Sequence, residues 1–302
     1  MNSMIEEIEA LKREKNAVIL AHYYVPDEVQ AIADEVGDSF YLSKKAKESA
    51  ADVIVFAGVS FMGESACMMN PGKKVLMPDI TADCAMAHMA SETAVAAMRE
   101  KYDDLAVVCY INSTAALKSV SDVCVTSSNA VKIVKKLPNK HIFFIPDGNL
   151  GAYVKEQVPE KDIILNDGYC PVHKNITAAD VRAAKKAHEN ALFFVHPECI
   201  AEVVAMADFV GSTADIIKFA KENAASEFII GTEDGVMYEL KRQNPAKQFY
   251  SVIKGQCCAD MKLVTLEKVR DCLKNETGLM EVQSEISELA VRPLQKMLEL
   301  AK

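Results

Sequence analysis

The chain has 302 residues, half of them apolar, and a formal net charge of −9 at pH 7. That length allows two or three domains with a sizeable core, and the acidic balance without any Lys/Arg run excludes nucleic acid as an expected partner. No run of eighteen apolar residues occurs, and residues 1–15 read as a charged amphipathic helix rather than a signal peptide, so we expect a cytoplasmic protein with no membrane partner.

Short apolar runs alternate with helical patterns along the chain. In the first third of the sequence, this pattern predicts strands at 17–21, 53–56 and 75–77 and helices at 27–35, 42–50 and 60–69. The second predicts strands at 105–109, 141–145 and 163–165 and helices at 115–120, 129–136 and 150–156. The third predicts strands at 191–195, 209–210, 227–230 and 248–252 and helices that begin at Glu198, Thr213 and Val236. Continuous apolar strands between helices indicate α/β architecture with parallel sheets covered on both faces.

The same order of elements recurs three times. Helices at 92–102 and 178–190 link the units, and helices near 266–275 and 285–301 follow the third. A regular period indicates repeated structural units. We therefore predict three homologous three-layer αβα domains with short parallel sheets, arranged about a pseudo-threefold axis. Their boundaries are expected at 1–87, 88–174 and 175–261, with a C-terminal helical appendage at 262–302.

Three of the nine cysteines follow this period. Cys84, Cys170 and Cys258 are 86 and 88 residues apart, and each lies in a loop just past an apolar strand. An odd number of cysteines argues against a disulfide framework, and the others, Cys257 apart, lie in apolar or helical stretches typical of core residues. If three like domains share an axis, the periodic thiolates converge there as a metal or cluster site with an open fourth position.

Serines recur at a second equivalent position. Ser39, Ser127 and Ser212 are 88 and 85 residues apart, each where a strand-like run gives way to a helix, and Thr213 follows the last. Helix capping explains any one of them. Three around one axis also suit the binding of a small polyanion by helix N-termini and hydroxyl groups.

Polar residues end the first strand of each unit. His22, Tyr110 and His196 are 88 and 86 residues apart, and two residues later come Tyr24, Asn112 and Glu198. One histidine after a strand is often only a satisfied polar side chain. Six polar groups at one equivalent position suit general acid and base chemistry on a metal-held substrate.

The motifs as a set resemble the quinolinate synthase family. They are A-H-Y-Y at 21–24, G-D-S at 37–39, P-D at 78–79 leading to Cys84, Y-I-N at 110–112, Ser127, P-D-x-N-L-G at 146–151, C-P-V-H at 170–173, H-P-E-C at 196–199, G-S-T at 211–213 and C-x-x-M-K at 258–262, followed by T-L-E at 265–267. They span nearly the whole chain in the family's order and spacing.

The resemblance implies three αβα domains around a 4Fe-4S cluster and a transferase of NAD biosynthesis that condenses iminoaspartate with dihydroxyacetone phosphate to give quinolinate, phosphate and water. It implies that Cys84, Cys170 and Cys258 ligate the cluster, whereas the adjacent Cys257 has no required role. An aspartate oxidase or dehydrogenase is the expected supplier of iminoaspartate.

The resemblance also assigns roles to the polar residues. Glu198 is expected to act as a base, and Tyr24 and Tyr110 as hydrogen-bond donors. His22 and His196 are expected to bind carboxylate or phosphate and to move protons. The remaining substrate-binding residues are expected to be Asn112, Ser39, Ser127, Ser212, Thr213 and His173, the last with a supporting role as the alternative.

Three other functions fit parts of the pattern. An aconitase-type hydro-lyase uses the same open iron, but the phosphate-ready serines argue against it. A non-catalytic iron or redox sensor predicts a partner surface or DNA-binding segment, and the sequence offers none. A structural zinc site formed by the three cysteines and His173 remains an alternative that metal analysis decides.

Overall fold

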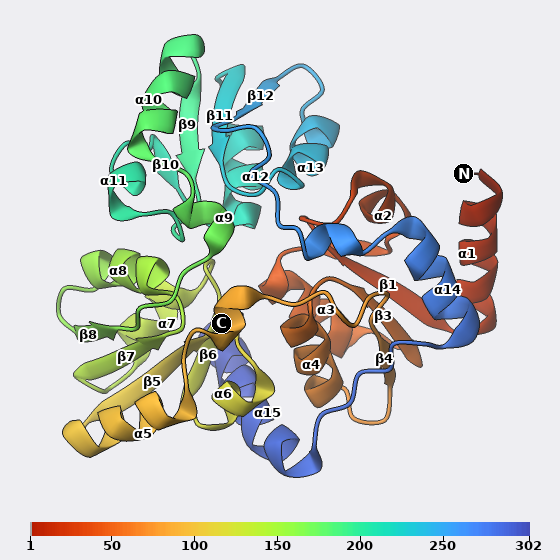
Figure 1. Ribbon diagram of the computed structural model, residues 1–302, viewed down its shortest axis with the longest axis horizontal. Coiled ribbons are helices and arrows are strands. Elements are labelled where there is room, and N and C mark those ends of the chain that lie inside the picture. The colour runs from red at the N-terminus through yellow and green to blue at the C-terminus, as the bar shows by residue number, and fades with distance from the viewer. Residues whose placement is uncertain (1) are drawn as a thin grey trace.

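A computed structural model describes residues 2–302, so Met1 of the predicted first helix and first domain lies outside the described residues. The chain forms three four-stranded parallel sheets, each in a separate lobe (Figure 1). The strands are β1 (Ala17–His22), β2 (Glu35–Gly37), β3 (Val53–Ala57) and β4 (Lys74–Leu76) in the first sheet, β5 (Leu105–Tyr110), β6 (Val123–Val125), β7 (His141–Ile145) and β8 (Asp162–Leu165) in the second, and β9 (Leu192–Val195), β10 (Phe209–Val210), β11 (Glu227–Gly231) and β12 (Gln248–Ser251) in the third.

Each sheet has the same strand order: β2-β1-β3-β4, β6-β5-β7-β8 and β10-β9-β11-β12. The helices of the first lobe are α1 (Asn2–Glu14), α2 (Asp27–Ile32), α3 (Ser39–Glu48) and α4 (Ser60–Met69). Those of the second are η1 (Ala85–His88), α5 (Glu92–Lys101), α6 (Ala115–Ser119), α7 (Ala130–Lys136), α8 (Gly148–Gln157) and α9 (Pro171–Lys174). After them come α10 (Ala178–Ala187), α11 (Ala201–Val204), α12 (Thr213–Glu222), α13 (Val236–Gln243), η2 (Met261–Leu263), α14 (Leu266–Asn275) and α15 (Ser284–Leu300). The α/β prediction is confirmed. The pseudo-threefold arrangement and the domain boundaries stay predictions.

The two central strands of each sheet are buried on both faces over most of their length, as parallel sheets covered by helices require. Every residue of β3 and β5 is buried. In the third sheet Phe193 packs into one apolar cluster and Phe194 into another, because neighbouring side chains of a strand point to opposite faces. Figure 1 shows α10 and α11 on one side of this sheet and α12 and α13 on the other.

Three local predictions differ from the structure. The three-residue strands β2 and β6 were expected only as strand-like runs before Ser39 and Ser127, without bounds, and Glu35 was placed at the end of a helix, because runs this short carry little periodicity. No helix begins at Glu198. Its N–H donates to Nδ1 of His196 and the Cys199 N–H to the His196 carbonyl, so a turn precedes α11.

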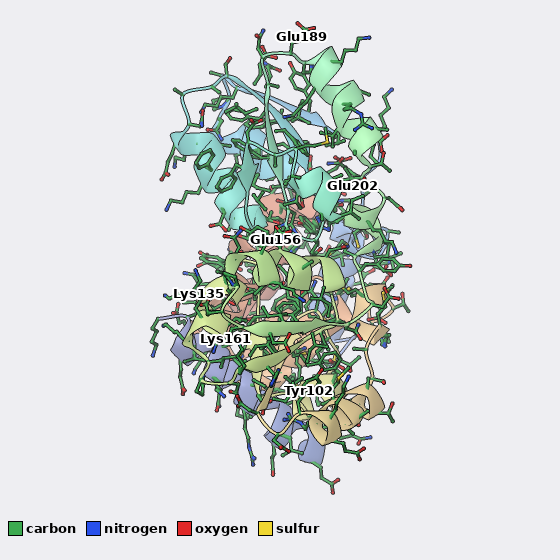
Figure 2. All side chains as sticks on the ribbon, turned by 90° about the vertical axis from the view of Figure 1, so that its left-hand side faces the viewer. Tyr102, Lys135, Glu156, Lys161, Glu189 and Glu202 are labelled. Atoms are coloured by element: carbon green, nitrogen blue, oxygen red, sulfur yellow. The ribbon has the colours of Figure 1, made fainter. Side chains whose placement is uncertain are left out.

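The two C-terminal helices join the first and second lobes. α14 packs against α1, whereas α15 packs against α6, β6 and α4 and buries Ala290, Leu294 and Met297 completely. The first two sheets share one apolar core with these helices, whereas the third lobe has separate clusters. In the side view the third lobe, which carries Glu189 and Glu202, stands above the second, which carries Glu156 and Lys161 (Figure 2). Within residues 2–302, no helix combines the length and the apolar character that crossing a bilayer requires.

Candidate active site

One cavity receives side chains from all three sheets. Every predicted site residue except Ser212 lines it: His22, Tyr24, Ser39, Cys84, Tyr110, Asn112, Ser127, Cys170, His173, His196, Glu198, Thr213 and Cys258. They come from equivalent strands. The His/Tyr set ends or follows β1, β5 and β9, the hydroxyl set follows β2, β6 and β10, and the cysteines follow β4, β8 and β12. The carboxyl ends of parallel strands are where such sheets bind ligands.

His22 and His196 have the same local structure. The backbone N–H of Tyr24 donates to Nδ1 of His22 (3.2 Å), and that of Glu198 donates to Nδ1 of His196 (3.3 Å). Burial lowers the pKa of each imidazole to about 3. Both rings are therefore neutral at physiological pH, with Nδ1 as the acceptor, and each has an Nε2–H left to donate to a ligand.

Glu198 is buried beside two histidine rings. Its Oε2 lies 2.7 Å from Nδ1 of His173 and 3.8 Å from Nδ1 of His196. The His173 contact is bent, since Nδ1 has no partner of regular hydrogen-bond geometry. Burial acts to raise the pKa of Glu198, but His173 and His196, with a hydrogen bond from Tyr110, lower it to about 2. Glu198 is thus an ionised carboxylate held inside the protein.

Tyr24 and Tyr110 keep their phenolic protons. The hydroxyl of Tyr24 lies 2.6 Å from Oγ1 of Thr213 and 2.8 Å from Oγ1 of Thr232. Burial raises the pKa of both phenols well above the usual value, and the charge of Glu198 adds to this effect. Both tyrosines can therefore serve as hydrogen-bond donors or acids.

The predicted hydroxyl residues differ in their local roles. Ser212 is fully buried and caps α12 by accepting from the N–H of Asp215, whereas Thr213 opens that helix at the cavity. Ser39 is the first residue of α3, which Asp38 caps. Ser127 lies in the loop after β6. Capping thus explains Ser212, the Thr213 hydroxyl already pairs with Tyr24, and the hydroxyl groups of Ser39 and Ser127 are available to a ligand.

The three periodic cysteines are free thiols that line the same cavity. Burial raises the pKa of Cys84 to about 12, with the charges of Glu198 and Cys258 acting in the same direction. Burial likewise raises the pKa of Cys170, and Glu198 and Cys84 add to it. Cys257 is exposed, its Sγ lies 3.7 Å from Oδ2 of Asp234, and it does not line the cavity. The donor set fits a soft metal centre because three thiols from three sheets open onto one space.

A second set of donor atoms lies within the same cavity. Sγ of Cys170, a ring nitrogen of His173 and a carboxylate oxygen of Glu198 lie within 4.8 Å of one another. Two of these residues are buried and the third is partly buried. This set has the ligand types that a zinc ion accepts.

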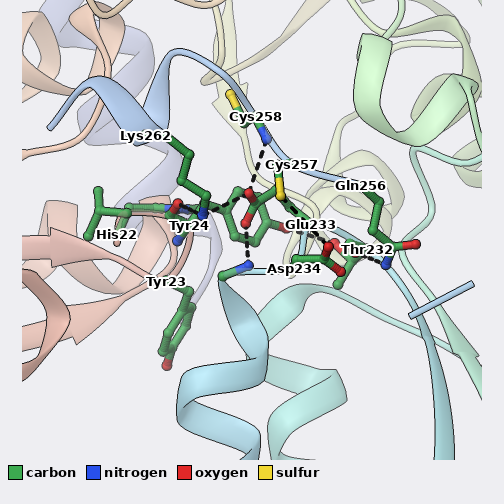
Figure 3. Close-up of polar contacts among 12 residues, drawn as sticks. His22, Tyr23, Tyr24, Thr232, Glu233, Asp234, Gln256, Cys257, Cys258 and Lys262 are labelled. Carbon is green, nitrogen blue, oxygen red and sulfur yellow. Dashed lines mark hydrogen bonds and ion pairs between the residues drawn. The ribbon is translucent and has the colours of Figure 1, made fainter. Parts of the chain in front are cut away.

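The sequence-based prediction missed several polar residues, among them Glu233. Its Oε1 accepts from the N–H of Cys258 (3.0 Å) and pairs with Nζ of Lys262 (3.0 Å), and its Oε2 accepts from the N–H of Gly235 (2.6 Å). Lys262 also donates to the carbonyl of Tyr24 at 2.6 Å (Figure 3). The pair therefore connects the Cys258 loop with the first sheet.

No repeat-wide signal marks Glu233. It lies two residues past β11, and the corresponding positions after β3 and β7 hold Val59 and Asp147. Asp38, Asp83 and Thr126 line the cavity as well and were not predicted. Among the described residues that line the cavity none is Lys or Arg, so anions must be held there by neutral donors and helix N-termini.

Replacing Lys262 by Met is expected to lower the free energy of unfolding by about 1–3 kcal/mol, because Glu233 then stays buried without its cation. Lys262 is 31% exposed, which places the loss below that of a fully buried pair. Chemical denaturation measures it. Lys274→Met is the control, since Lys274 and Glu7 form an exposed pair worth less than about 1 kcal/mol. Equal losses in the two variants would contradict the structural role of the Glu233–Lys262 pair.

Residues 6–299 match the model of the family described as quinolinate synthetase A protein. The chain belongs to this quinolinate synthase family. It is 56% identical over 295 residues to a quinolinate synthase of Caldicellulosiruptor saccharolyticus. That alignment covers 98% of this chain and 97% of the relative. It is 51% identical over 298 residues to one of Fusobacterium nucleatum subsp. nucleatum (99% of each chain) and 49% identical over 296 residues to one of Clostridioides difficile (98% and 97%).

These likenesses confirm the family that the motifs indicated, and with it an enzyme of the quinolinate synthase type.

Proposed function

We propose that the protein catalyses the condensation of iminoaspartate with dihydroxyacetone phosphate to quinolinate, a transferase reaction in the de novo synthesis of NAD. The observation that carries this proposal is the cavity at which the periodic cysteines of all three sheets meet the His, Tyr and Glu side chains expected from the family's motifs. The reaction balances without an oxidant, because one phosphate and two waters leave while the pyridine ring forms.

The proposed cofactor is a 4Fe-4S cluster held by Cys84, Cys170 and Cys258. When bound, such a cluster supplies an iron with an open position that acts as a Lewis acid on a substrate oxygen or nitrogen. Cys257 is not proposed as a ligand, since its exposed thiol does not line the cavity.

The cavity residues suit the binding of small anions. The free Nε2–H groups of His22 and His196 donate to carboxylate or phosphate oxygens. The buried Oδ1 of Asn112 has no partner and can accept from a substrate N–H or O–H. Ser39 and Ser127 add hydroxyl donors. Ser39 and Thr213 also lie in the first turn of a helix, where the dipole favours an anion.

Proton transfer is assigned to Glu198 and the two tyrosines. The ionised Glu198 can take a proton from a substrate carbon or oxygen and return it in a later step. Tyr24 and Tyr110 keep their protons and can donate to a leaving or enolic oxygen. The buried side chains that line the cavity limit the access of water to a bound substrate during these proton transfers.

A single zinc ion at Cys170, His173 and Glu198 is the second candidate for the metal centre, because these donor atoms lie within 4.8 Å of one another. An aconitase-type hydro-lyase is the alternative activity. It would not need the phosphate-ready hydroxyl groups after β2, β6 and β10.

The deciding experiment is an anaerobic assay for quinolinate, with iron, sulfide and zinc quantified in the same sample. The proposal expects quinolinate and equimolar phosphate from the two substrates, with iron and sulfide in the protein. Protein with its full metal content that forms no quinolinate and releases no phosphate would exclude this function. Zinc in place of iron would favour the second metal site.

A further inference from the structure

A fully buried lysine lies behind the cavity, and none of the roles proposed above involves it. Lys118 of α6 has no exposed surface, and its Nζ donates to the backbone carbonyl of Ser113 at 2.6 Å. Nζ also lies 5.5 Å from the centroid of the Phe61 ring. Phe61 lines the cavity, and Ser113 follows the cavity residue Asn112. An ammonium group is thus held behind the wall of a cavity whose described lining residues include no Lys or Arg.

Ionisable groups on both sides of this wall act on the Lys118 ammonium. Burial lowers the pKa of Lys118, and the charges of Cys124, Glu64, Cys109 and Cys84 oppose that effect. Cys84 lines the cavity, so the interaction reaches across the wall. A bound anion in the cavity would oppose the effect of burial in the same way. The charge of Lys118 and the charge of such an anion therefore stabilise each other.

The first lobe has a neutral side chain at the equivalent position. Lys118 lies 88 residues after Gln30, the interval that also separates the ends of β1 and β5. Nε2 of Gln30 donates to the carbonyl of Val25 at 3.0 Å, and Ser113 lies 88 residues after Val25. An amide thus makes in the first lobe the bond that Lys118 makes in the second. Holding the loop after β5 therefore does not require a charge.

We propose that Lys118 is a positioning residue whose buried positive charge strengthens the binding of dianionic substrates in the cavity. This role rests on the function proposed above, in which both substrates are anions. Lys118 does not line the cavity, so its charge attracts the anion without a hydrogen bond to it. Such an interaction is stronger in the low dielectric of the protein interior than in water. The neutral donors of the cavity orient the anion, and Lys118 supplies the charge that these donors lack.

Lys118→Gln and Lys118→Met form the matched test. Glutamine removes the charge and keeps an N–H for the Ser113 carbonyl, as Gln30 does for Val25, whereas methionine removes both. We expect both iron-loaded variants to bind succinate, a dicarboxylate, more weakly than the wild type does. The expected loss is about 2- to 15-fold for each unit of ligand charge, the range that Coulomb's law gives for unit charges about 10 Å apart at effective dielectric constants from about 80 to 20. Isothermal titration calorimetry measures the Kd.

The charge of the ligand is varied as well. Succinamate, the monoamide of succinate, has one charge, so its affinity should fall less than that of succinate in both variants. Lys136→Met is the control. Nζ of Lys136 also donates to a backbone carbonyl, that of Leu300 at 2.6 Å, but its side chain is exposed and does not line the cavity. Its Kd for both ligands should equal that of the wild type. Iron content measured in each variant shows that the metal site is assembled.

Three outcomes overturn the proposal. A wild-type affinity in Lys118→Gln, with a loss in Lys118→Met, would assign Lys118 to holding the loop rather than to supplying charge. An equal loss for succinate and succinamate would show that the charge of the ligand does not matter. No binding of either ligand by the wild-type holoenzyme would remove the anion site itself. If the wild-type enzyme binds succinate but makes no quinolinate, the function proposed above fails, whereas the comparison of the two ligands still tests Lys118. If Lys118→Met does not fold, Lys118→Gln alone decides between charge and hydrogen bond.

Discussion

Single replacement of Cys84, Cys170 or Cys258 by Ala is expected to remove bound iron and abolish quinolinate formation. Among the described residues that line the cavity, each of these is the one thiol that its sheet contributes, after β4, β8 or β12. A cluster deprived of one of three protein thiolates is left with two, and neighbouring irons lose their fixed positions. No loss of this size is expected from Cys257→Ala, which removes an exposed thiol beside Asp234.

The four variants are compared after anaerobic purification, by iron and sulfide content, by the brown absorbance of the cluster and by quinolinate formation. Cys257→Ala is the matched control, because it makes the same chemical change one residue from Cys258. A colourless Cys257→Ala protein would reverse the choice between the two adjacent cysteines. A full metal content in Cys84→Ala and Cys258→Ala, with loss in Cys170→Ala, would instead place the metal at Cys170, His173 and Glu198.

The fold was predictable because the same pattern of strands and helices repeats three times along the sequence. Equivalent strands such as 53–56, 141–145 and 227–230 lie within one residue of their observed ends. The predictions failed where local interactions outweigh periodicity. β2 and β6 have three residues each and depend on pairing with β1 and β5, which no local pattern reports. The turn at 196–200 depends on a side-chain bond to the His196 ring.

Site residues that recur at equivalent positions of the three units could be predicted from the sequence. Site residues that occur in one unit could not. His22, Tyr110 and His196 end equivalent strands, so their convergence follows from the repeat. Glu233 has a carboxylate counterpart in Asp147 of the second unit but none in the first, and Thr232 has no counterpart of the same chemistry in the other units. Their importance arises from contacts between lobes, with the Cys258 N–H and with Tyr24. Such contacts depend on how the three lobes pack, and a single sequence gives no measure of that packing.

Glu198→Gln is expected to lower kcat by about 10²- to 10⁴-fold, the usual effect of removing a general base. The amide has nearly the shape of the carboxylate, but it cannot take a proton or carry the charge that faces His173 and His196. Iron content is expected to stay at the wild-type level. Steady-state kinetics at saturating substrate, on protein of known iron content, measures the effect.

Glu239→Gln is the matched control. Glu239 is also largely buried, but its carboxylate pairs with Arg242 (2.7 Å) and Gln243 (2.5 Å) away from the cavity, so kcat should be unchanged. An unchanged kcat in Glu198→Gln would remove Glu198 from the chemistry. The iron measurement carries separate information: if Glu198→Gln loses metal as well as activity, the carboxylate holds the metal rather than a proton. In that case the compact Cys170, His173 and Glu198 set is the metal centre, and the function of the other two periodic cysteines has to be sought elsewhere.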